Sequence, residues 1–438
     1  MYFTKSKALL ALIILLLICV AALFMRQIEV PYVSPNYNQA DIAWMLTATA
    51  LVLLMTPGLA FFYGGMVNKK NVISTMLQSF IAMAVTTILW VVIGFSCSFG
   101  DSLYGIYGNP LTFFMGKGLI GGAPMAAAPT IPLLLFAMYQ LKFAIITPAL
   151  ITGAVAGRIR FTGYIIFLVL FCLFIYCPLA HATWHPNGIL AKLGVLDFAG
   201  GTVVHMSSGW AALAAALYLK KQNEEPLTHA RITYVMLGTG LLWFGWFGFN
   251  AGSAFSANSL ATTALATTTI ASASAAFTWI LCDTIRGRRP GALGTCIGAV
   301  VGLVAITPAA GYVSLPHSLI IGVVCSMISN WMVQVRSRTG IDDTLDVFPC
   351  HGVGGMVGML LTAVFAHKNI NPAVVNNGLL FGETKLFVVH CIALVGVSGF
   401  AFFGTQLILR ITNFLSPLGV NIADERLGLD VSQHGETL

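Results

Sequence analysis

The chain has 438 residues, of which 58% are hydrophobic and only 8% are charged. A typical soluble domain is about 25% charged, so this composition excludes an ordinary soluble protein. The formal net charge of +7 is not a nucleic-acid signal, because the basic residues lie in short loops between apolar runs.

Apolar runs near the length that spans a bilayer, about 20 residues, recur along almost the whole chain. Backbone groups in lipid must hydrogen-bond internally, which leaves helices or closed barrels. Barrel strands are about ten residues of alternating polarity, and these runs do not alternate. The sequence therefore predicts an all-α, polytopic membrane protein. Eleven spans are expected near residues 42–65, 71–97, 130–156, 161–180, 199–219, 232–256, 261–285, 292–312, 317–335, 348–366 and 385–410.

One more apolar segment, residues 8–25, precedes these spans and follows Lys5 and Lys7. Its charged start and short core are typical of a signal peptide, but no clean A-x-A cleavage site follows it. Residues 1–30 are therefore interpreted as a signal peptide or an extra N-terminal helix, with cleavage slightly favoured. Both alternatives leave residue 40 outside.

Basic residues accumulate in the loops on one side of the predicted spans. The positive-inside rule makes that side cytoplasmic, so the first span starts outside and the tail after Arg410 is cytoplasmic. We therefore expect a multi-pass protein of the cytoplasmic membrane. The basic loop residues are Lys69, Lys70, Arg158, Arg160, Lys220, Lys221, Arg231, Arg286, Arg288, Arg289, Arg336 and Arg338.

Two short stretches, five spans apart, resemble each other. "DFAGGTVVHM" opens the fifth span with Asp197 and His205, and "DVFPCHGVGG" opens the tenth with Asp346 and His351. In both, a glycine follows the histidine by four residues. An odd number of spans per half inverts the second half, and inverted repeats with a midplane site are a recurring transporter plan. The histidines are therefore predicted to be functional, in preference to core residues bonded to backbone carbonyls.

Each of the two aspartates has two interpretations. Asp197 lies at the outer end of its span, where an N-cap aspartate accepts backbone N–H bonds and suits the helix dipole. Direct contact with a ligand is the alternative. A structural cap is favoured for Asp197, and Asp346 is interpreted in the same way at the inner face.

Two further stretches contain candidate site residues. In "WFGFNAGS" (246–253), Phe249 and Ser253 are four residues apart and therefore share a helical face. Trp184, in "HATWHPNG" (181–188), is either an interface-belt tryptophan or a site residue. His181 and His185 in that stretch lack a third ligand nearby, so we expect no metal.

These stretches resemble the ammonium transporter family (Amt/Mep, distantly related to Rh proteins). The resemblance covers roughly residues 41–438. It implies two inverted five-helix repeats plus a final helix over 41–410, a cytoplasmic regulatory tail over 411–438, and homotrimers with one pore in each protomer. The matching motifs are "TPGLAFFYGGMV" (56–67), "ITPALITGAVAGRIRF" (146–161), "DFAGGTVVHMSSG" (197–209), "WFGFNAGSA" (246–254), "HGVGG" (351–355) and "GLDVSQHGE" (428–436).

The resemblance also implies residue roles and partners. Asp197 matches the family's outer aspartate, which orders the vestibule. The implied substrate is ammonium or ammonia, with methylammonium as a further candidate, and a PII-type regulator is the implied partner of the tail. The implied outer ammonium site consists of Trp184, Ser253 and Tyr139. The implied aromatic gate consists of Tyr139 and Phe249, and the implied pair of pore histidines is His205 and His351.

The chemistry of ammonium favours separation of the proton from ammonia. Moving the isolated cation into a dry core costs far more than any one contact returns, whereas a tryptophan face supplies about 0.5–2 kcal/mol. Neutral imidazoles present a donor and an acceptor at physiological pH, so two of them could bond ammonia and relay a proton. This hypothesis requires no cofactor.

Two residues depart from the family pattern. Tyr139 stands where phenylalanine is more common, and its hydroxyl must find a partner. Lys142 is a lysine within a span, which is expensive, so it is interpreted as a structural residue or as a modulator of conduction. Lys142 keeps open an ammonium sensor as the alternative function. An enzyme is not expected, because neither a metal triad nor an activated nucleophile is apparent.

Overall fold

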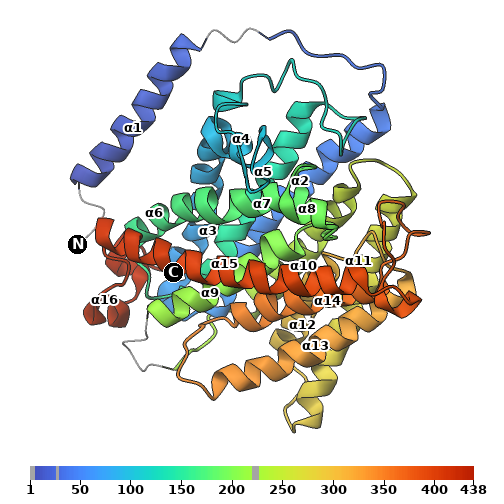
Figure 1. Cartoon of the computed structure of the whole chain (residues 1–438). Coiled ribbons are helices and arrows are strands. Elements are labelled where there is room, and N and C mark those ends of the chain that lie inside the picture. The colour runs from blue at the N-terminus through green and yellow to red at the C-terminus, as the bar shows by residue number, and fades with distance from the viewer. Residues whose placement is uncertain (1–4, 26–28, 220–225) are drawn as a thin grey trace.

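The computed structural model describes residues 5–25, 29–219 and 226–438, and Lys220 and Lys221 of the predicted basic loops lie outside these ranges. The described chain is a bundle of long helices that run between two layers of loops (Figure 1). Within the described ranges, its β-strands form one hairpin of β1 (Ser102–Leu103) and β2 (Tyr107–Gly108), and an isolated antiparallel bridge joins Ile159 to Gly419. The predicted all-α fold is confirmed.

The first half of the bundle contains five membrane-crossing elements. Three of them change from α to π geometry along their length, which places single wide turns inside otherwise regular helices. The elements are α2 (Gln39–Met66); α3 (Val72–Leu89) with η2 (Trp90–Gly94) and α4 (Phe95–Phe99); α5 (Leu133–Ile151) with η4 (Thr152–Val155); α6 (Phe161–Phe171) with η5 (Cys172–Tyr176) and α7 (Cys177–Trp184); and η6 (Gly201–Met206) with α9 (Ser207–Tyr218).

The second half repeats this plan with five elements and adds a final helix. The short elements η1 (Lys69–Asn71), η3 (Phe114–Gly116), α8 (Ile189–Leu193) and η10 (Leu379–Phe381) lie in connections. The spanning elements are α10 (Ile232–Trp246) with η7 (Phe247–Ala251) and η8 (Gly252–Ala254); α11 (Ser259–Ile285); α12 (Ala292–Ile306); α13 (Leu315–Ser337); η9 (Phe348–Val353) with α14 (Gly354–Phe365); and α15 (Lys385–Leu415).

The eleven predicted spans agree with these elements. Within the described residues, ten helices are long and apolar enough to cross a membrane, and α1 (Lys5–Phe24) is one of them. The remaining nine correspond to predicted spans. The two predicted spans outside this set are α12, a shorter apolar helix, and the fifth span, which begins in the π turn η6. α15 continues to Leu415, five residues beyond its predicted end.

Glycines allow the two halves to cross at the centre of the bundle. α9 packs against η9, and α14 packs against η6. A Cβ atom on Gly209 would overlap the backbone of Gly352, and one on Gly355 would lie 3.1 Å from the carbonyl oxygen of Gly201. The glycines that follow each histidine by four residues are therefore contact points between the repeats, where backbones touch directly.

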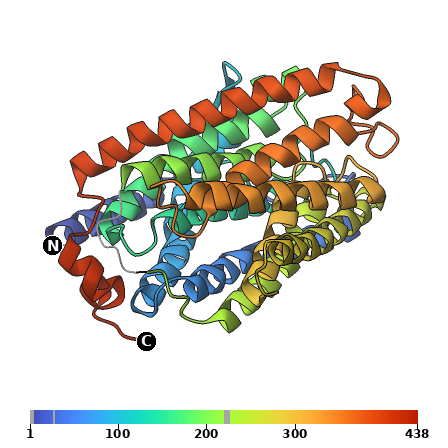
Figure 2. The same cartoon turned by 90° about the horizontal axis from the view of Figure 1, so that it is seen from below.

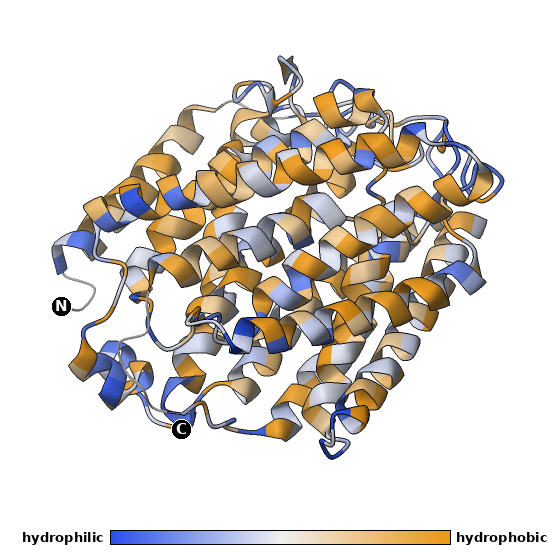
Figure 3. Cartoon of the chain, turned by 60° about the horizontal axis from the view of Figure 1, so that its bottom comes forward, coloured by the Kyte–Doolittle hydropathy of each residue, from blue (hydrophilic) through white to orange (hydrophobic). Residues whose placement is uncertain are grey.

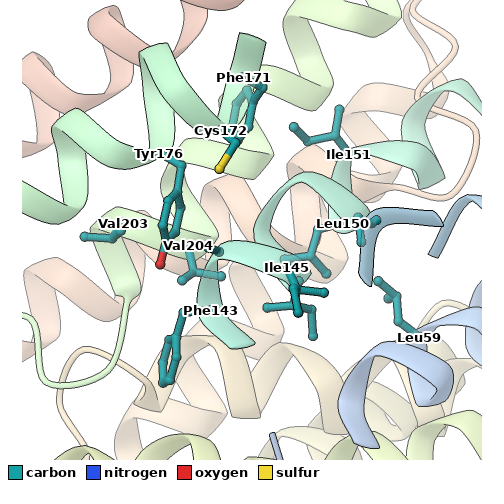
Figure 4. Packing of buried hydrophobic residues seen from close by; sticks show 14 of the residues in the cluster. Leu59, Phe143, Ile145, Leu150, Ile151, Phe171, Cys172, Tyr176, Val203 and Val204 are labelled. Atoms are coloured by element: carbon teal, nitrogen blue, oxygen red, sulfur yellow. The ribbon is translucent and has the colours of Figure 1, made fainter. Parts of the chain in front are cut away.

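Hydrophobic residues predominate along the helices, and hydrophilic residues are concentrated in the loops (Figure 3). The interior near the centre of the bundle is also apolar. Phe143, Ile145 and Leu150 of α5 lie close to Tyr176 of η5 and Val204 of η6 (Figure 4). This packing fixes α5 against the π turn that carries His205, which is why the centre of the bundle positions the candidate site.

The N-terminal helix and the C-terminal tail lie at the edge of the bundle. No side chain of α1 is buried, and the helix runs apart from the others, although Lys7 Nζ lies 2.9 Å from Ser416 Oγ (Figure 1). Cleavage of this segment stays a prediction. The tail contains α16 (Ile422–Leu427) and η11 (Asp430–His434) and folds back under the bundle (Figure 2).

Candidate functional site

The histidines of the two repeats meet in the middle of the bundle. Their rings stack with centroids 5.4 Å apart and planes 28° apart. The two Nδ1 atoms are 3.3 Å apart, so one Nδ1 carries a proton and the other accepts it. His205 then differs from His351 in tautomer: one ring presents a bare Nε2 and the other presents Nε2–H. The pair therefore offers one acceptor and one donor beyond its mutual contact.

Neighbouring side chains fix the orientation of His205. The Trp246 indole stacks on its ring with centroids 5.4 Å apart. Trp246 Nε1 donates to Thr307 Oγ1 at 2.9 Å, which holds the indole in place. Nε2 of His205 is buried and has no hydrogen-bond partner among the described residues. A buried imidazole nitrogen without a partner is costly, which makes this atom a candidate contact for a passing solute.

The space around the pair is narrow and apolar. A cavity of about 10 Å³, the volume of one water-sized probe, lies beside both histidines. A second cavity of about 10 Å³ continues from His351 past Tyr63 and Cys350. The first cavity is lined otherwise by Met55, Leu59, Phe62, Ile146, Leu150, Val204, Leu242, Trp246, Phe249 and Val300.

A much wider cavity of about 380 Å³ opens at the predicted outer end. Trp184 and Ser253 both line it, as does Asp197. Trp184 Nε1 donates to the carbonyl oxygen of Asp197 at 3.1 Å, which orients the indole. The cavity thus combines an aromatic face with a hydroxyl oxygen, two groups that suit a small cation with N–H donors.

Asp197 accepts the backbone N–H groups that begin its half-helix. Its Oδ1 lies 2.7 Å from Gly200 N and 2.6 Å from Gly201 N, and its Oδ2 lies 2.9 Å from Thr202 N. The Thr202 hydroxyl donates to the same carboxylate. Both oxygens are therefore occupied as in a helix cap, although the residue borders the outer cavity.

The corresponding cap of the second repeat is Asp343, and the cap predicted at Asp346 is wrong. Asp343 accepts from Val347 N at 3.0 Å and from Phe348 N at 2.7 Å. Asp346 instead has a left-handed backbone, with φ of 56°, and pairs with Arg336 at 2.6 Å. The sequence spacing could have identified Asp343 as the cap, because Asp343 precedes His351 by eight residues, just as Asp197 precedes His205.

The cap of the second repeat has an unusual ionisation. Burial, reinforced by the nearby charge of Asp346, raises the pKa of Asp343 to about 7, although its two backbone N–H donors and Arg336 act in the opposite direction. A cavity of about 260 Å³ lies close by and is lined by charged residues of several loops and of the tail. Arg158 in this cavity forms an ion pair with Asp342, so this end of the pathway is lined by ion-paired residues.

The resemblance implied a gate of Tyr139 and Phe249, but the ring that stacks on Phe249 is Phe143. The centroids of Phe143 and Phe249 are 4.2 Å apart with planes 29° apart. Phe143 also packs edge-on against Trp184 and lines the outer cavity, whereas Phe249 lines the narrow one. The stacked pair therefore separates the two cavities. Tyr139 lies one helical turn away, fully buried, and lines neither cavity.

Lys142 is half-buried on a side of α5 that does not line the described cavities. Leu134, two turns earlier on the same side, is exposed. Across the described ranges, no hydrogen bond or ion pair of Lys142 with the protein is found. Within the described part of the chain, neither a carboxylate nor a backbone carbonyl therefore offsets the charge of Lys142.

Comparisons with known proteins identify the relatives of this chain. The model of the Ammonium Transporter Family matches residues 43–438. An ammonium transporter of Aquifex aeolicus is 44% identical over 401 residues, which cover 91% of this chain and 93% of that protein. The crystal structure of Saccharomyces cerevisiae Mep2 has a TM-score of 0.83 with 34% identity and covers 89% of each chain. A structure described as a sensor Amt protein has a TM-score of 0.82 with 27% identity and covers 90% of this chain and 98% of that one.

Proposed function

The chain belongs to the ammonium transporter family, and from this premise we propose that it recruits ammonium at the outer cavity, removes its proton and conducts ammonia past the histidine pair. The observation that carries the proposal is the position of His205 and His351 between two narrow apolar cavities. A charged ion has no compensating groups there, whereas a neutral amine can bond to an imidazole nitrogen.

Recruitment is the first step. We assign it to the face of Trp184 and the oxygen of Ser253, which line the outer cavity. A cation–π contact is worth about 0.5–2 kcal/mol, and a hydroxyl oxygen accepts one N–H bond. These contacts concentrate the ion at the mouth, but they are too weak to carry a charge across the apolar stretch.

The stacked pair of Phe143 and Phe249 is the proposed gate. With their centroids 4.2 Å apart, the rings leave no passage, so a solute passes only when a ring moves. Asp197 is proposed to order the mouth through its cap. Tyr139 is not part of the proposed gate, because it lines neither the outer cavity nor the narrow one.

The histidine pair is the proposed route for both products of deprotonation. Ammonia bonds to the Nε2 atoms, and the Nδ1–Nδ1 contact of 3.3 Å between His205 and His351 allows a proton to pass from one ring to the other. A proton that enters one imidazole and leaves the second restores both neutral rings. Transport is then electrogenic, because one charge crosses for each ammonia molecule.

Orientation and assembly follow from the family and the charge pattern. We propose a cytoplasmic-membrane homotrimer with its tail in the cytoplasm, because Arg158 and Arg286 lie in loops, and Arg336 at the end of α13, on the tail side. The tail is proposed to bind a PII-type regulator. Ammonium is the proposed substrate and methylammonium a slower one.

The proposal is tested with currents on a solid-supported membrane. Proteoliposomes with wild-type protein should give a current after an ammonium pulse, and His205→Ala should reduce it at least about tenfold, because the proton loses its relay. His181→Ala is the matched control, since His181 bonds to Ser98 O and Ser102 Oγ, away from the pair. Unchanged current and uptake in His205→Ala would contradict the mechanism.

A second candidate is an ammonium sensor on the same scaffold. It is favoured by the similarity to a sensor Amt protein and by the unpartnered charge of Lys142, which raises the cost of any cation nearby. Lys142→Met separates the candidates in the same assay. A silent wild type with a conducting Lys142→Met variant would favour the sensor, whereas current in the wild type supports transport.

A further inference from the structure

The hydroxyl of Tyr139 is directed at the irregular end of α10. Tyr139 Oη lies 2.9 Å from the carbonyl oxygen of Gly248, 2.9 Å from that of Phe249 and 3.2 Å from Ser253 Oγ. The residue is fully buried in α5. One side chain therefore ties α5 to the turn that carries Phe249 and to the serine of the outer cavity.

The segment that receives this hydroxyl departs from regular helix. The backbone changes from α to π at Phe247, to 3₁₀ at Gly252, and to a positive φ of 54° at Phe255. Irregular turns of this kind need side-chain partners to hold one conformation. Gly252 leaves room for the partner, because a Cβ there would lie 2.7 Å from Tyr139 Oη.

Each of the two hydroxyls has one proton to donate, which determines its hydrogen-bonding role. Ser253 Oγ donates to the carbonyl oxygen of Phe249 at 2.8 Å, which uses its only proton. Tyr139 donates its single proton to the nearer carbonyl oxygens at 2.9 Å rather than to Ser253 at 3.2 Å. Ser253 Oγ then keeps an acceptor lone pair for the outer cavity, where an N–H donor can reach it.

The ring of Tyr139 supports the stacked pair from behind. Its centroid lies 5.0 Å from that of Phe143 and 5.8 Å from that of Phe255, both edge-on. Phe143 in turn stacks on Phe249. Tyr139 therefore contacts one ring of the pair directly and holds the backbone of the other through its hydroxyl.

We propose that Tyr139 is a positioning residue that sets the selectivity of the outer mouth. It holds Phe249 against Phe143, and it fixes the Phe249 carbonyl that accepts the Ser253 proton, so that the Ser253 oxygen faces the cation. The inference rests on the proposed function and extends it to the discrimination between ammonium and methylammonium. A fixed ring pair resists the bulk of a methyl group, and a fixed acceptor favours the cation with four N–H donors. Without the tyrosine hydroxyl, both constraints loosen.

Tyr139→Phe tests this directly, because it keeps the ring and deletes only the hydroxyl. In the current assay, we expect the KM for ammonium to rise about fivefold, the effect of one neutral hydrogen bond. The ratio of methylammonium to ammonium current should rise by at least about twofold. Tyr176→Phe is the matched control, because the buried Tyr176 hydroxyl has no hydrogen-bond partner in the described part of the chain.

Two further measurements separate positioning from a purely structural role. If Tyr139 acts through Ser253, Tyr139→Phe should change KM little in a Ser253→Ala background. Ammonium-dependent shifts in melting temperature give an apparent affinity that does not require transport, so they test Tyr139 even if the wild type carries no current. A Tyr139→Phe variant with a lower melting temperature but unchanged apparent affinity and unchanged current ratio would overturn the proposal.

Discussion

At the proposed outer mouth Asp197 caps the π turn that carries His205, and at the proposed cytoplasmic mouth Asp343 caps the π turn that carries His351. The backbone device is the same, but the surroundings differ. Aromatic rings and hydroxyls line the outer cavity, whereas Arg158, Arg336 and Glu425 of the tail line the inner one. The repeat thus fixes where the histidines stand, and each mouth adds its own chemistry.

This difference separates two tasks. The outer mouth offers weak contacts to a cation, which suits selection of a substrate. The cytoplasmic mouth is built from ion pairs between loops, together with Glu425 of the tail. Ion pairs that join separate loops respond to any partner or ionisation that shifts one of them, so this mouth suits control.

The largest effect is expected where the two repeats touch. Gly209→Val would force a branched side chain into the backbone of Gly352, so we expect a loss of about 3 kcal/mol or more of stability. Thermal unfolding of the purified protein in detergent measures this loss. Gly240→Val is the control, because a Cβ at that helical position meets open space. Equal melting temperatures for the two variants would show that the repeats do not depend on this contact.

The next effect compares the two caps. Asp197→Asn places an amide NH₂ against backbone N–H donors that now face a carboxylate, and we expect it to cost about 1.5–3 kcal/mol. Asp343→Asn should cost less, about 1 kcal/mol, because Asp343 caps with two N–H donors and is partly neutral near pH 7. Melting temperatures of both variants at one pH make the comparison. An equal or larger loss at Asp343 would remove the distinction between the mouths.

The pH dependence sharpens that comparison. The pKa of Asp343 is raised to about 7 in the fold, against about 3.9 for an unperturbed aspartate. Its contribution to stability is therefore fully present below about pH 4 and is lost as the pH rises through about 7. The stability advantage of the wild type over Asp343→Asn should shrink by roughly 2–3 kcal/mol between pH 5 and pH 8, because each pH unit below a pKa of about 7 counts for about 1.4 kcal/mol. A constant difference across this range would contradict the raised pKa.

Periodicity and charge predicted the spans of this fold closely, because a bilayer imposes one length and one polarity on every crossing. The contacts inside the pathway were harder to predict. Tyr139 and Phe143 are one helical turn apart on α5, so sequence spacing leaves open which ring meets Phe249. That choice depends on how far α5 is shifted along its axis relative to η7, which only packing of the whole bundle determines.

The caps show the same limit in another form. Asp343 and Asp346 both precede the second histidine, and local chemistry suits either as an N-cap. The eight-residue spacing shared with the first repeat identifies Asp343, while Arg336, ten residues before Asp346 in sequence, occupies the other carboxylate. A salt bridge between a helix end and a loop has no sequence signature, so the role of Asp346 required the structure.

The smallest effect is expected from a substitution in the tail, which should change the cytoplasmic mouth and leave the outer mouth unchanged. Asp430 accepts from Ile73 N at 3.1 Å and from Ser74 N at 2.7 Å, so it caps α3 from the far end of the chain. Asp430→Ala should cost about 1 kcal/mol, seen as a lower melting temperature. Glu436→Ala is the control, because exposed Glu436 caps no helix.

Currents decide whether this loss stays at the cytoplasmic mouth. The tail reaches the inner cavity through Glu425 and does not line the outer one. Asp430→Ala should therefore lower the maximal current by about twofold, the scale of a 0.4 kcal/mol change, and leave the KM for ammonium unchanged. A changed KM with an unchanged maximal current would mean that the tail acts on the outer mouth, and the division of tasks between the two mouths would be wrong.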